Sequence, residues 1–285
     1  MSEGVDKMLH ANAKLSPAVA KLQARSKTTD QITNPYFRCL IHGEIDSRKT
    51  TTAISFSTPE LTRVILTRGE DQLLPFRKQK YRFLEVNNAT EFTNACTYCD
   101  QIWPDWAQLP DRVLVVDDIA RAKDYLVKDN ETYVVGGEVR EHKDARKIYG
   151  AANKAMDEAF TVMNEKPMHL ILVSTSKISE NELTQDETIF PDLSPGMRNI
   201  VLSDCSYIFY INKKKPWDRC LLTTKDTEQV SYYDEKLKRE IGYQRVFFAR
   251  NKMAIEDAQM KGAQQVLQQY EPLDLGSIWA RVKGL

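Results

Sequence analysis

The sequence lacks the features that mark several special classes of protein. Its 285 residues hold no run of 18 or more apolar residues, so we expect no membrane-spanning helix. The first residues contain no apolar signal core, and we therefore expect the protein to stay in the cytoplasm where it is made. The chain also has no internal repeat and no low-complexity tract.

An excess of charge of either sign is missing too. The chain has 40 Lys and Arg residues and 40 Asp and Glu residues, so its formal net charge is zero. A protein without net charge has a weak overall electric field. Any affinity for nucleic acid must therefore come from local basic patches.

Cysteine is scarce, and its five copies are an odd number, which argues against a disulfide framework. Cys96 and Cys99 form a C-x-x-C inside the segment 91–103, which has helical spacing. No second Cys or His pair follows at the distance of zinc ligands. Two core-facing helix residues are therefore favoured over a metal site at this pair.

What the sequence does contain is typical of a globular α/β protein. Apolar residues make up 42% and charged residues 28% of the chain, whose length suits one large α/β domain or two small ones. Predicted strands that are continuous apolar runs alternate with predicted helices, a pattern typical of a parallel sheet covered on both faces. The predicted strands are 36–41, 62–67, 81–86, 112–118, 169–174 and 206–211, and the predicted helices are 49–58, 91–103, 120–129, 143–165 and 253–269.

The remaining segments complete the predicted organisation. Residues 219–224 and 244–249 are predicted to add antiparallel strands to the sheet, and Gly136-Gly137 to form a turn or short hairpin. The polar segment 177–199 exceeds the usual loop length, which indicates a functional or mobile loop. A shorter loop is expected at 104–110 and a tail at 273–285. The predicted parts of the chain are an N-terminal arm (1–34), a nucleotide-binding domain (35–255) and a C-terminal helix and tail (256–285).

One stretch, from Gly43 to Thr50, has the spacing of a phosphate-binding loop between a strand and a helix. In the pattern G-x-x-x-x-G-K-[ST], backbone N–H groups at a helix N-terminus point at a phosphate, a lysine reaches its outer oxygens, and a hydroxyl binds Mg²⁺. Gly43, Lys49 and Thr50 fit these roles. The stretch is therefore a candidate nucleotide site.

The loop departs from the pattern at one position. Arg48 stands where the second glycine belongs, and its Cβ and side chain crowd a backbone position that normally needs glycine. The loop interior also places Glu44 and Asp46 beside the expected anion. Arg48 could abolish nucleotide binding or supply an extra cation that faces the phosphates. An ordinary strand-to-helix turn stays open as the other interpretation of this stretch.

A second candidate, Asp117-Asp118, ends the apolar run 113–116. A carboxylate at the end of a neighbouring buried strand is the partner that a phosphate-binding loop requires, because it holds the Mg²⁺ water shell opposite the Thr50 hydroxyl. Many α/β strands end in Asp, so the run alone is a weak signal. Together with the loop, and in the right alternation of strands and helices, it favours a nucleotide-binding core.

With these residues in place, the chain resembles the RecA-like P-loop ATPases, and most of all the compact phage-type members associated with single-strand annealing and recombination. The resemblance is one of pattern and order and covers residues 35–255. It implies an α/β fold with a RecA-like P-loop NTPase core, whose parallel central sheet is flanked by helices and extended by antiparallel strands on its C-terminal side. The matching segments are 43–53, 113–118, 169–174, 190–196, 207–211, 221–224 and 247–252.

The resemblance also implies the cofactors ATP and Mg²⁺ and a role for each matching residue. Lys49 would contact the β- and γ-phosphates, Thr50 and Asp117 would hold Mg²⁺, and Glu70, after the second strand, would activate water. A solvent-facing loop acid is the other interpretation of Glu70. The nucleotide-binding set is Gly43, Ser47, Arg48, Lys49, Thr50 and Thr51, the catalytic set is Glu70, Lys49 and Asp117, and the sensor position holds Ser174 and Ser176.

A homo-oligomer follows from the same resemblance. Arg250 and Lys252 come after the late strand, where such proteins present a cation to the nucleotide of a neighbouring subunit. A basic pair on the surface is the alternative interpretation of these two residues.

Single-stranded DNA is the expected nucleic-acid partner. The segment 177–199 follows the sensor strand but is acidic, which repels phosphate. The run 213–217 is the better candidate, since it combines three cations with a stacking surface. A solvent-exposed hairpin tip is its other interpretation. The residues in question are Lys213, Lys214, Lys215 and Trp217.

We therefore expect an ATP-binding RecA-like protein of phage or bacterial DNA recombination or replication, which binds single-stranded DNA as an oligomer, in the host cytoplasm if it is viral. Hydrolysis of ATP stays open. The alternative is a non-catalytic adaptor or assembly module that keeps the fold with a decayed loop. Arg48 favours the adaptor, whereas the joint presence of Lys49, Thr50 and Asp117 opposes it. A kinase-like phosphotransferase is disfavoured because the chain has no Arg-rich lid.

Overall fold

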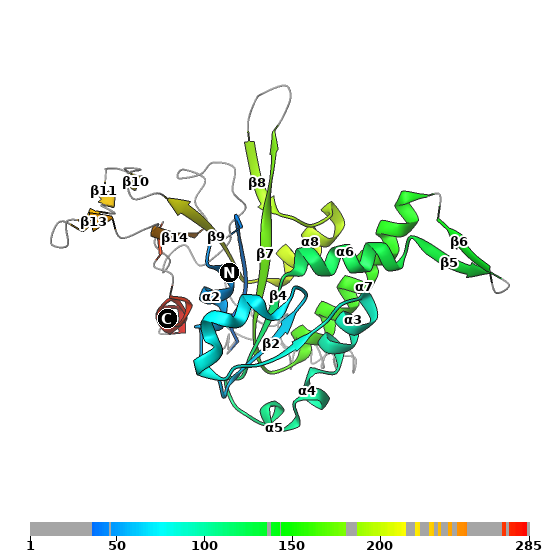
Figure 1. Cartoon of the computed structure of the whole chain (residues 1–285), viewed down its shortest axis with the longest axis horizontal. Coiled ribbons are helices and arrows are strands. Elements are labelled where there is room, and N and C mark those ends of the chain that lie inside the picture. The colour runs from blue at the N-terminus through cyan, green and yellow to red at the C-terminus, as the bar shows by residue number, and fades with distance from the viewer. Residues whose placement is uncertain are drawn as a thin grey trace, which may run out of the picture. The chain divides into compact units, whose positions relative to one another are not determined.

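One large sheet organises the chain, as Figure 1 shows. The structure, a computed structural model, describes residues 36–45, 47–135, 138–142, 144–180, 187–214 and 274–283, with the strand segments 220–222, 228–230, 233–234, 239–240, 244–249 and 270–271. The predicted arm 1–34 and the predicted helix 253–269 lie outside these residues.

The middle of the sheet is parallel. In spatial order its strands are β9 (Tyr207–Lys214), β1 (Arg38–Gly43), β7 (His169–Glu180), β4 (Val113–Asp117), β2 (Thr62–Leu66) and β3 (Arg82–Glu85). Each neighbouring pair in this series is parallel. β2 and β4 are buried along their whole length, as expected for apolar runs with helices on both faces. This mostly parallel sheet confirms the predicted α/β class.

Antiparallel strands extend the sheet beyond β9, which confirms the prediction for 244–249. β14 (Gln244–Ala249) pairs with β9, and β15 (Tyr270–Glu271) pairs with β14. β8 (Glu187–Pro191) pairs antiparallel with the second half of β7. The predicted addition of 219–224 is wrong, because β10 (Cys220–Leu222) pairs with β11 (Glu228–Val230) in a separate two-stranded sheet.

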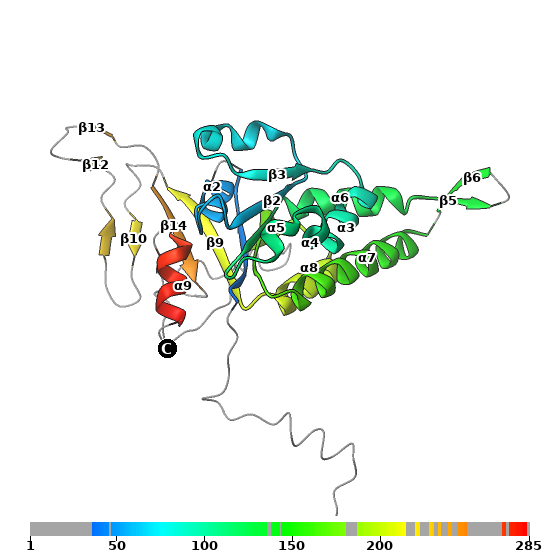
Figure 2. The ribbon, with the colours of Figure 1, turned by 90° about the horizontal axis from the view of Figure 1, so that it is seen from below.

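Helices cover both faces of the sheet (Figure 2). Successive strand residues point to opposite faces, so Leu114 and Val116 of β4 enter one buried cluster while Val113 and Val115 enter the other. The first cluster includes side chains of α3 (Ala89–Thr97), α6 (Ile119–Asp129), α7 (Ala145–Glu165) and α8 (Pro195–Asp204). The second includes side chains of α2 (Lys49–Ile54), the 3₁₀ helix η3 (Glu70–Gln79) and α9 (Leu275–Lys283).

Side-chain caps fix the starts of the four longer helices that contribute to the first cluster. The capping residues are Asn88 for α3, Asp118 for α6, Asp144 for α7 and Ser194 for α8. Each side-chain oxygen accepts a hydrogen bond from a backbone N–H two or three residues further on, which satisfies a donor that the helix itself leaves open. α2 differs, because Arg48 precedes it and no side chain caps it.

The predicted loop at 177–199 is wrong. β7 continues to Glu180, β8 returns antiparallel from Glu187, and α8 begins at Pro195. The segment is rich in charged residues and was therefore predicted as a loop, but residues 176–180 of β7 pair with residues 187–191 of β8. Ser194-Pro195 is a recognisable helix start, with a capping hydroxyl followed by proline at the first helical position.

Smaller differences concern the ends of helices. α3 ends at Thr97 and the separate helix α4 (Cys99–Ile102) follows it, so the predicted helix 91–103 is divided. The predicted loop 104–110 contains the short helix α5 (Pro104–Ala107), and α2 ends at Ile54, earlier than expected. The predicted tail 273–285 is wrong, because α9 lies there and buries Leu275 and Ile278 in the second cluster.

Two short hairpins accompany the main sheet. β5 (Thr132–Val135) and β6 (Glu138–Glu141) form the hairpin predicted around Gly136-Gly137. β12 (Tyr233–Asp234) pairs antiparallel with β13 (Arg239–Glu240). Among the described helices, none has the length and apolar character needed to cross a membrane.

The C-x-x-C pair belongs to the core, as predicted. Cys96 and Cys99 are both buried in the first cluster. Burial raises the pKa of both thiols, to about 11 for Cys99, which keeps them protonated at neutral pH. These are packing residues.

Candidate functional site

The candidate site lies where parallel strands reach their carboxyl ends. Gly43, the last residue of β1, lies opposite Thr175 of β7 and Ile211 of β9. Asp117, the last residue of β4, lies opposite Val173 of β7. β7 therefore separates β1 from β4, and the chain that follows β1 has to pass across β7 to contact the end of β4.

Glycine is required at position 43 by its neighbours. A Cβ added there would lie 2.6 Å from the Ile211 carbonyl oxygen and 2.8 Å from the Ser47 hydroxyl oxygen. Real Cβ atoms do not approach a backbone oxygen so closely. The first glycine of the predicted loop thus allows the loop to turn directly against β9.

Arg48 adopts a backbone conformation that favours glycine. Its φ is 64° and its ψ 24°, in the left-handed region that L-residues rarely occupy. The side chain is exposed. The predicted crowding at the backbone is therefore avoided by turning the side chain outward, at the cost of a strained φ.

Lys49 is the first residue of α2 and lies inside the loop, only 9% exposed. Its Nζ donates hydrogen bonds to the carbonyl oxygens of Gly43, at 3.0 Å, and Glu44, at 2.5 Å, and lies 3.4 Å from the Ser47 hydroxyl. The ammonium group is thus held by the carbonyls of its own loop.

Thr50 and Asp117 connect the loop to the end of β4. The Thr50 hydroxyl donates a hydrogen bond of 2.5 Å to Asp117 Oδ2. The Asp117 carboxylate is buried, and this burial raises its pKa to about 6, while the hydrogen bond from Thr50 opposes the rise. A cation beside Asp117 would favour the ionised carboxylate. The structure therefore brings together the two residues predicted to hold Mg²⁺.

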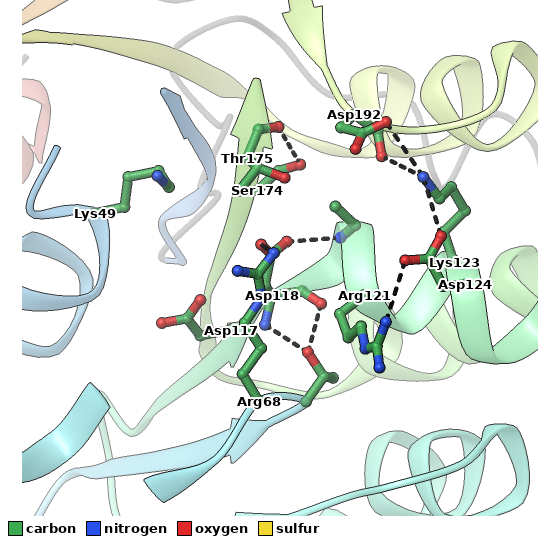
Figure 3. Close-up of polar contacts among 12 residues, drawn as sticks. Lys49, Arg68, Asp117, Asp118, Arg121, Lys123, Asp124, Ser174, Thr175 and Asp192 are labelled. Atoms are coloured by element: carbon green, nitrogen blue, oxygen red, sulfur yellow. Dashed lines mark hydrogen bonds and ion pairs between the residues drawn. The ribbon is translucent and has the colours of Figure 1, made fainter. Parts of the chain in front are cut away.

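Asp118 has a structural partner in Arg68, a residue that the sequence analysis did not select. Arg68 Nη2 lies 3.0 Å from Asp118 Oδ2. The same carboxylate caps α6 by accepting the Ala120 N–H at 2.7 Å. Burial raises the pKa of Asp118, and the Arg68 cation opposes that rise. Figure 3 shows Arg68 beside Asp118 at the start of α6.

Thr67 ties the ends of β2 and β4 to each other and to α6. Its hydroxyl donates to the Asp118 carbonyl at 2.7 Å and accepts the Asp118 N–H at 2.8 Å. The Tyr125 hydroxyl, on α6, donates to the Thr67 carbonyl at 2.8 Å. The backbone that carries Arg68 and Asp118 is therefore held in place by hydrogen bonds from three elements.

These side chains surround a cavity of about 420 Å³, here called the loop cavity. Three cations and two carboxylates line it, so its charged groups are mainly positive. The lining residues are Ile45, Ser47, Arg48, Lys49, Thr50, Thr51, Arg68, Gln72, Asp117, Asp118 and Thr175.

Glu70, predicted to activate water, does not line the loop cavity. It begins η3, is exposed, and lines a different cavity with Leu73, Phe76 and Tyr81. The residues after β2 that line the loop cavity are Arg68 and, on η3, Gln72. No sequence pattern marks either of them, because a single Arg or Gln after a strand is common.

The residues at the sensor position lie close to the loop cavity without lining it. Ser174 is buried, and its hydroxyl donates to the Thr175 carbonyl at 2.9 Å. The Ser176 Oγ lies 2.9 Å from His42 Nδ1, within hydrogen-bonding distance. Thr175, between them, is the residue of β7 that reaches the cavity.

The residues predicted to contact DNA or a neighbouring subunit are mostly outside the described part of the chain. Lys213 and Lys214 form the last two positions of β9, opposite Arg245 and Gln244 of β14. The structure does not describe the other four of these residues, Lys215, Trp217, Arg250 and Lys252. Asp46 of the predicted phosphate-binding loop also lies outside the described residues.

A larger cavity, of about 680 Å³, is lined by residues of α6, α7 and the start of α8. Two of its cations have partners: Lys123 lies 3.2 Å from Asp192 and 3.3 Å from Asp124, and Arg198 lies over the Phe190 ring. The residues of the predicted phosphate-binding loop do not line this larger cavity, whereas Ser47, Lys49 and Thr50 line the loop cavity. We therefore assign the candidate nucleotide site to the loop cavity.

The donors of the loop cavity fit a metal ion that arrives with a nucleotide. Within the described ranges, no group of three or more His, Cys, Asp or Glu side chains could hold a metal ion. Thr50 and Asp117 supply one hydroxyl and one carboxylate. Mg²⁺ is commonly held by one or two carboxylates together with phosphate oxygens and water, so this pair suits it.

No protein-family model matches the chain, and no curated protein matches it.

Proposed function

We propose that the chain binds ATP together with Mg²⁺ in the loop cavity, as a RecA-like P-loop protein. The observation that carries the proposal is the 2.5 Å hydrogen bond from Thr50 to Asp117, which joins the loop to the end of β4 across β7. A hydroxyl and a carboxylate are the protein groups that a nucleotide-bound Mg²⁺ requires. Here they share a cavity with Arg48, Lys49 and Arg68.

The loop supplies the groups that would bind phosphate. By helix geometry the first N–H groups of α2 have no intrahelical acceptor, and no side chain caps them. Lys49 donates to neutral carbonyls of the loop, and an anionic phosphate oxygen is a stronger acceptor. Arg48 adds an exposed cation at the cavity wall.

Mg²⁺ would be held by Thr50 and Asp117. When bound, the ion neutralises charge on the phosphate oxygens. The protein contributes the fixed positions of the two side chains, since α2 carries Thr50 and β4 carries Asp117.

Binding, more than hydrolysis, is what this geometry favours. Asp117 accepts the Thr50 hydroxyl and Asp118 accepts the Ala120 N–H at the start of α6, so both carboxylates of the cavity are engaged. Glu70 lines a different cavity. Gln72 is a lining side chain that could orient a water molecule. We therefore expect hydrolysis by the isolated chain to be slow.

The wider role that we propose is in phage or bacterial DNA recombination or replication, as a homo-oligomer that binds single-stranded DNA. It is supported by the sequence alone, through the run Lys213–Lys215 with Trp217 and through Arg250 and Lys252. Stimulation of ATP hydrolysis by single-stranded DNA is the expected sign of this role.

An adaptor without nucleotide is the second candidate. It is favoured by Arg48, whose strained φ occupies the glycine position, and by Lys49, whose ammonium group is satisfied by the loop carbonyls. On this view the loop cavity is a remnant and the fold serves assembly.

Binding of a fluorescent ATP analogue in the presence of Mg²⁺ distinguishes the two candidates. Wild type is compared with Lys49→Ala and with the control Lys154→Ala, which removes an exposed lysine of α7 that pairs with Glu158. We expect saturable binding by the wild type and the control and loss of binding in Lys49→Ala. Thermal unfolding curves are recorded to check that all three proteins are folded. No binding by the wild type at millimolar nucleotide would overturn the proposal and leave the adaptor.

A further inference from the structure

Arg68 occupies an unusual position at the boundary between a structural ion pair and the loop cavity. It follows β2 by two residues, lines the cavity with Lys49 and Thr50, and its side chain is 39% exposed. Its Nη2 is paired with the buried Asp118 at 3.0 Å. One end of the guanidinium is thus anchored while the side chain as a whole remains accessible from the cavity.

The guanidinium of Arg68 has an N–H donor that makes no hydrogen bond to the residues that the structure describes. Within the described part of the chain, its Nε is buried and has no hydrogen-bond acceptor. A buried donor without an acceptor carries a free-energy cost that an incoming acceptor removes. A guanidinium carries five N–H donors arranged to bind phosphate or carboxylate through two bonds at once. If the Arg68 side chain turned toward the cavity, an anionic ligand there could accept hydrogen bonds from Nε as well as from the terminal nitrogens.

Asp118 does not depend on Arg68 for all of its hydrogen bonds. Its carboxylate accepts the Ala120 N–H at 2.7 Å and also interacts with the Thr175 backbone N–H. It lies at the N-terminus of the 11-residue helix α6, where a negative charge is stabilised. The carboxylate can therefore keep most of its stabilisation when Arg68 turns toward another anion.

We propose that Arg68 recognises the terminal phosphate of a nucleoside triphosphate by exchanging its Asp118 partner for that phosphate. The inference rests on the proposed nucleotide binding and adds a specificity-determining residue to it. A diphosphate lacks the group that Arg68 would reach, so the Arg68–Asp118 pair persists with a diphosphate and opens with a triphosphate. Arg68 thereby sets the preference of the cavity for triphosphate over diphosphate.

Two variants with opposite expected effects test the inference. Arg68→Ala removes the recognising side chain, and Asp118→Asn removes the competing charge while leaving an oxygen that can cap α6, since Asn is as good a cap as Asp. The affinities of a non-hydrolysable ATP analogue and of ADP, both with Mg²⁺, are measured by calorimetry. The exposed Arg121→Ala on α6, whose side chain pairs with Asp124, is the matched control.

We expect Arg68→Ala to lower the ratio of triphosphate to diphosphate affinity by about tenfold, the effect of one charge-assisted hydrogen bond. Asp118→Asn should raise the same ratio, because Arg68 is released, and Arg121→Ala should leave it unchanged. A purely structural ion pair would instead weaken both nucleotides equally in Arg68→Ala and in Asp118→Asn, with lower thermal stability.

The outcomes separate this inference from the proposed function. Wild type that binds nucleotide, with an unchanged ratio in Arg68→Ala or a lowered ratio in Asp118→Asn, overturns the role of Arg68 alone. Wild type that binds neither nucleotide overturns the proposed function and the inference together.

Discussion

Two helices begin at the loop cavity, and they begin in opposite ways. α6 starts with Asp118, whose carboxylate accepts a backbone N–H of the helix and is paired with Arg68. α2 starts after Arg48, which has a left-handed backbone and provides no side-chain cap. A side-chain cap satisfies one of the N–H donors at the start of a helix, whereas an uncapped start leaves all of these donors to water or to a ligand. On the proposed function, the phosphates would bind on the α2 side, while the α6 side carries a fixed negative charge.

The α2 side depends most strongly on Gly43, so the largest effect is expected there. Gly43→Ala would bring a Cβ to 2.6 Å from the Ile211 carbonyl oxygen and force the loop to move. We expect a loss of about 2 kcal/mol in the free energy of unfolding, typical of overpacking, and a loss of nucleotide binding. Chemical denaturation measures the first effect and fluorescence titration the second.

Gly150→Ala is the matched control for this substitution. Gly150 lies inside α7, and a Cβ there would meet no atom within 4 Å. Alanine in a helix interior should stabilise the protein by about 0.5–1 kcal/mol. If both variants lose the same stability, the close contact at Gly43 does not determine the geometry of the loop.

Arg48→Gly tests the start of α2, and we expect it to change the free energy of unfolding less than Gly43→Ala does. Glycine adopts the left-handed φ of 64° without strain but loses more conformational entropy on folding than arginine does. We expect a net gain of about 0.5 kcal/mol in the free energy of unfolding, measured by chemical denaturation. Arg48→Ala, which keeps a Cβ in the same conformation, should show no such gain. Equal stability of the two variants would show that strain at this position is negligible.

The smallest effect concerns the amino end of β7, far along the strand from the cavity. His169 is buried and accepts the Phe37 N–H on Nδ1 at 2.8 Å. Burial lowers its pKa in the folded protein, an effect that Asp111 opposes, while the unfolded chain binds the proton near pH 6.5. The unfolded state therefore binds more protons below about pH 6.5, and stability should fall as the pH decreases through this value.

Thermal unfolding between pH 8 and pH 5.5 measures this dependence, with His169→Gln as the control. Glutamine cannot take up a proton, so the fall in stability below about pH 6.5 should become smaller in the variant. An identical pH profile in both proteins would assign the dependence to other groups.

The loop and Asp117 were predictable because each is a local pattern with a physical reason. The spacing of Gly43, Lys49 and Thr50 and the apolar run before Asp117 can be recognised without knowing the fold. The 2.5 Å contact between Thr50 and Asp117 follows once both strands end at the same edge of a parallel sheet. The α/β class was predictable for the same reason, since continuous apolar strands need cover on both faces.

Other features could not be predicted because they depend on tertiary contacts. Arg68 becomes a candidate only through its ion pair with Asp118, which is far away in sequence. Glu70 was predicted because it is an acid in the expected loop, but it lines a different cavity. The second half of β7 and β8 were not predicted as strands because the segment is polar and charged, although the two pair with each other. The prediction of a tail missed α9, although Leu275, Ile278 and Val282 repeat at helical spacing.

The close contact of Gly43 with β9 has a mechanical consequence. Because Gly43 leaves no space between the loop and the Ile211 carbonyl, the loop and β9 cannot slide past each other independently. β9 continues from Ile211 to Lys213 and Lys214. We therefore expect a displacement of β9 at Ile211 to move the loop with it.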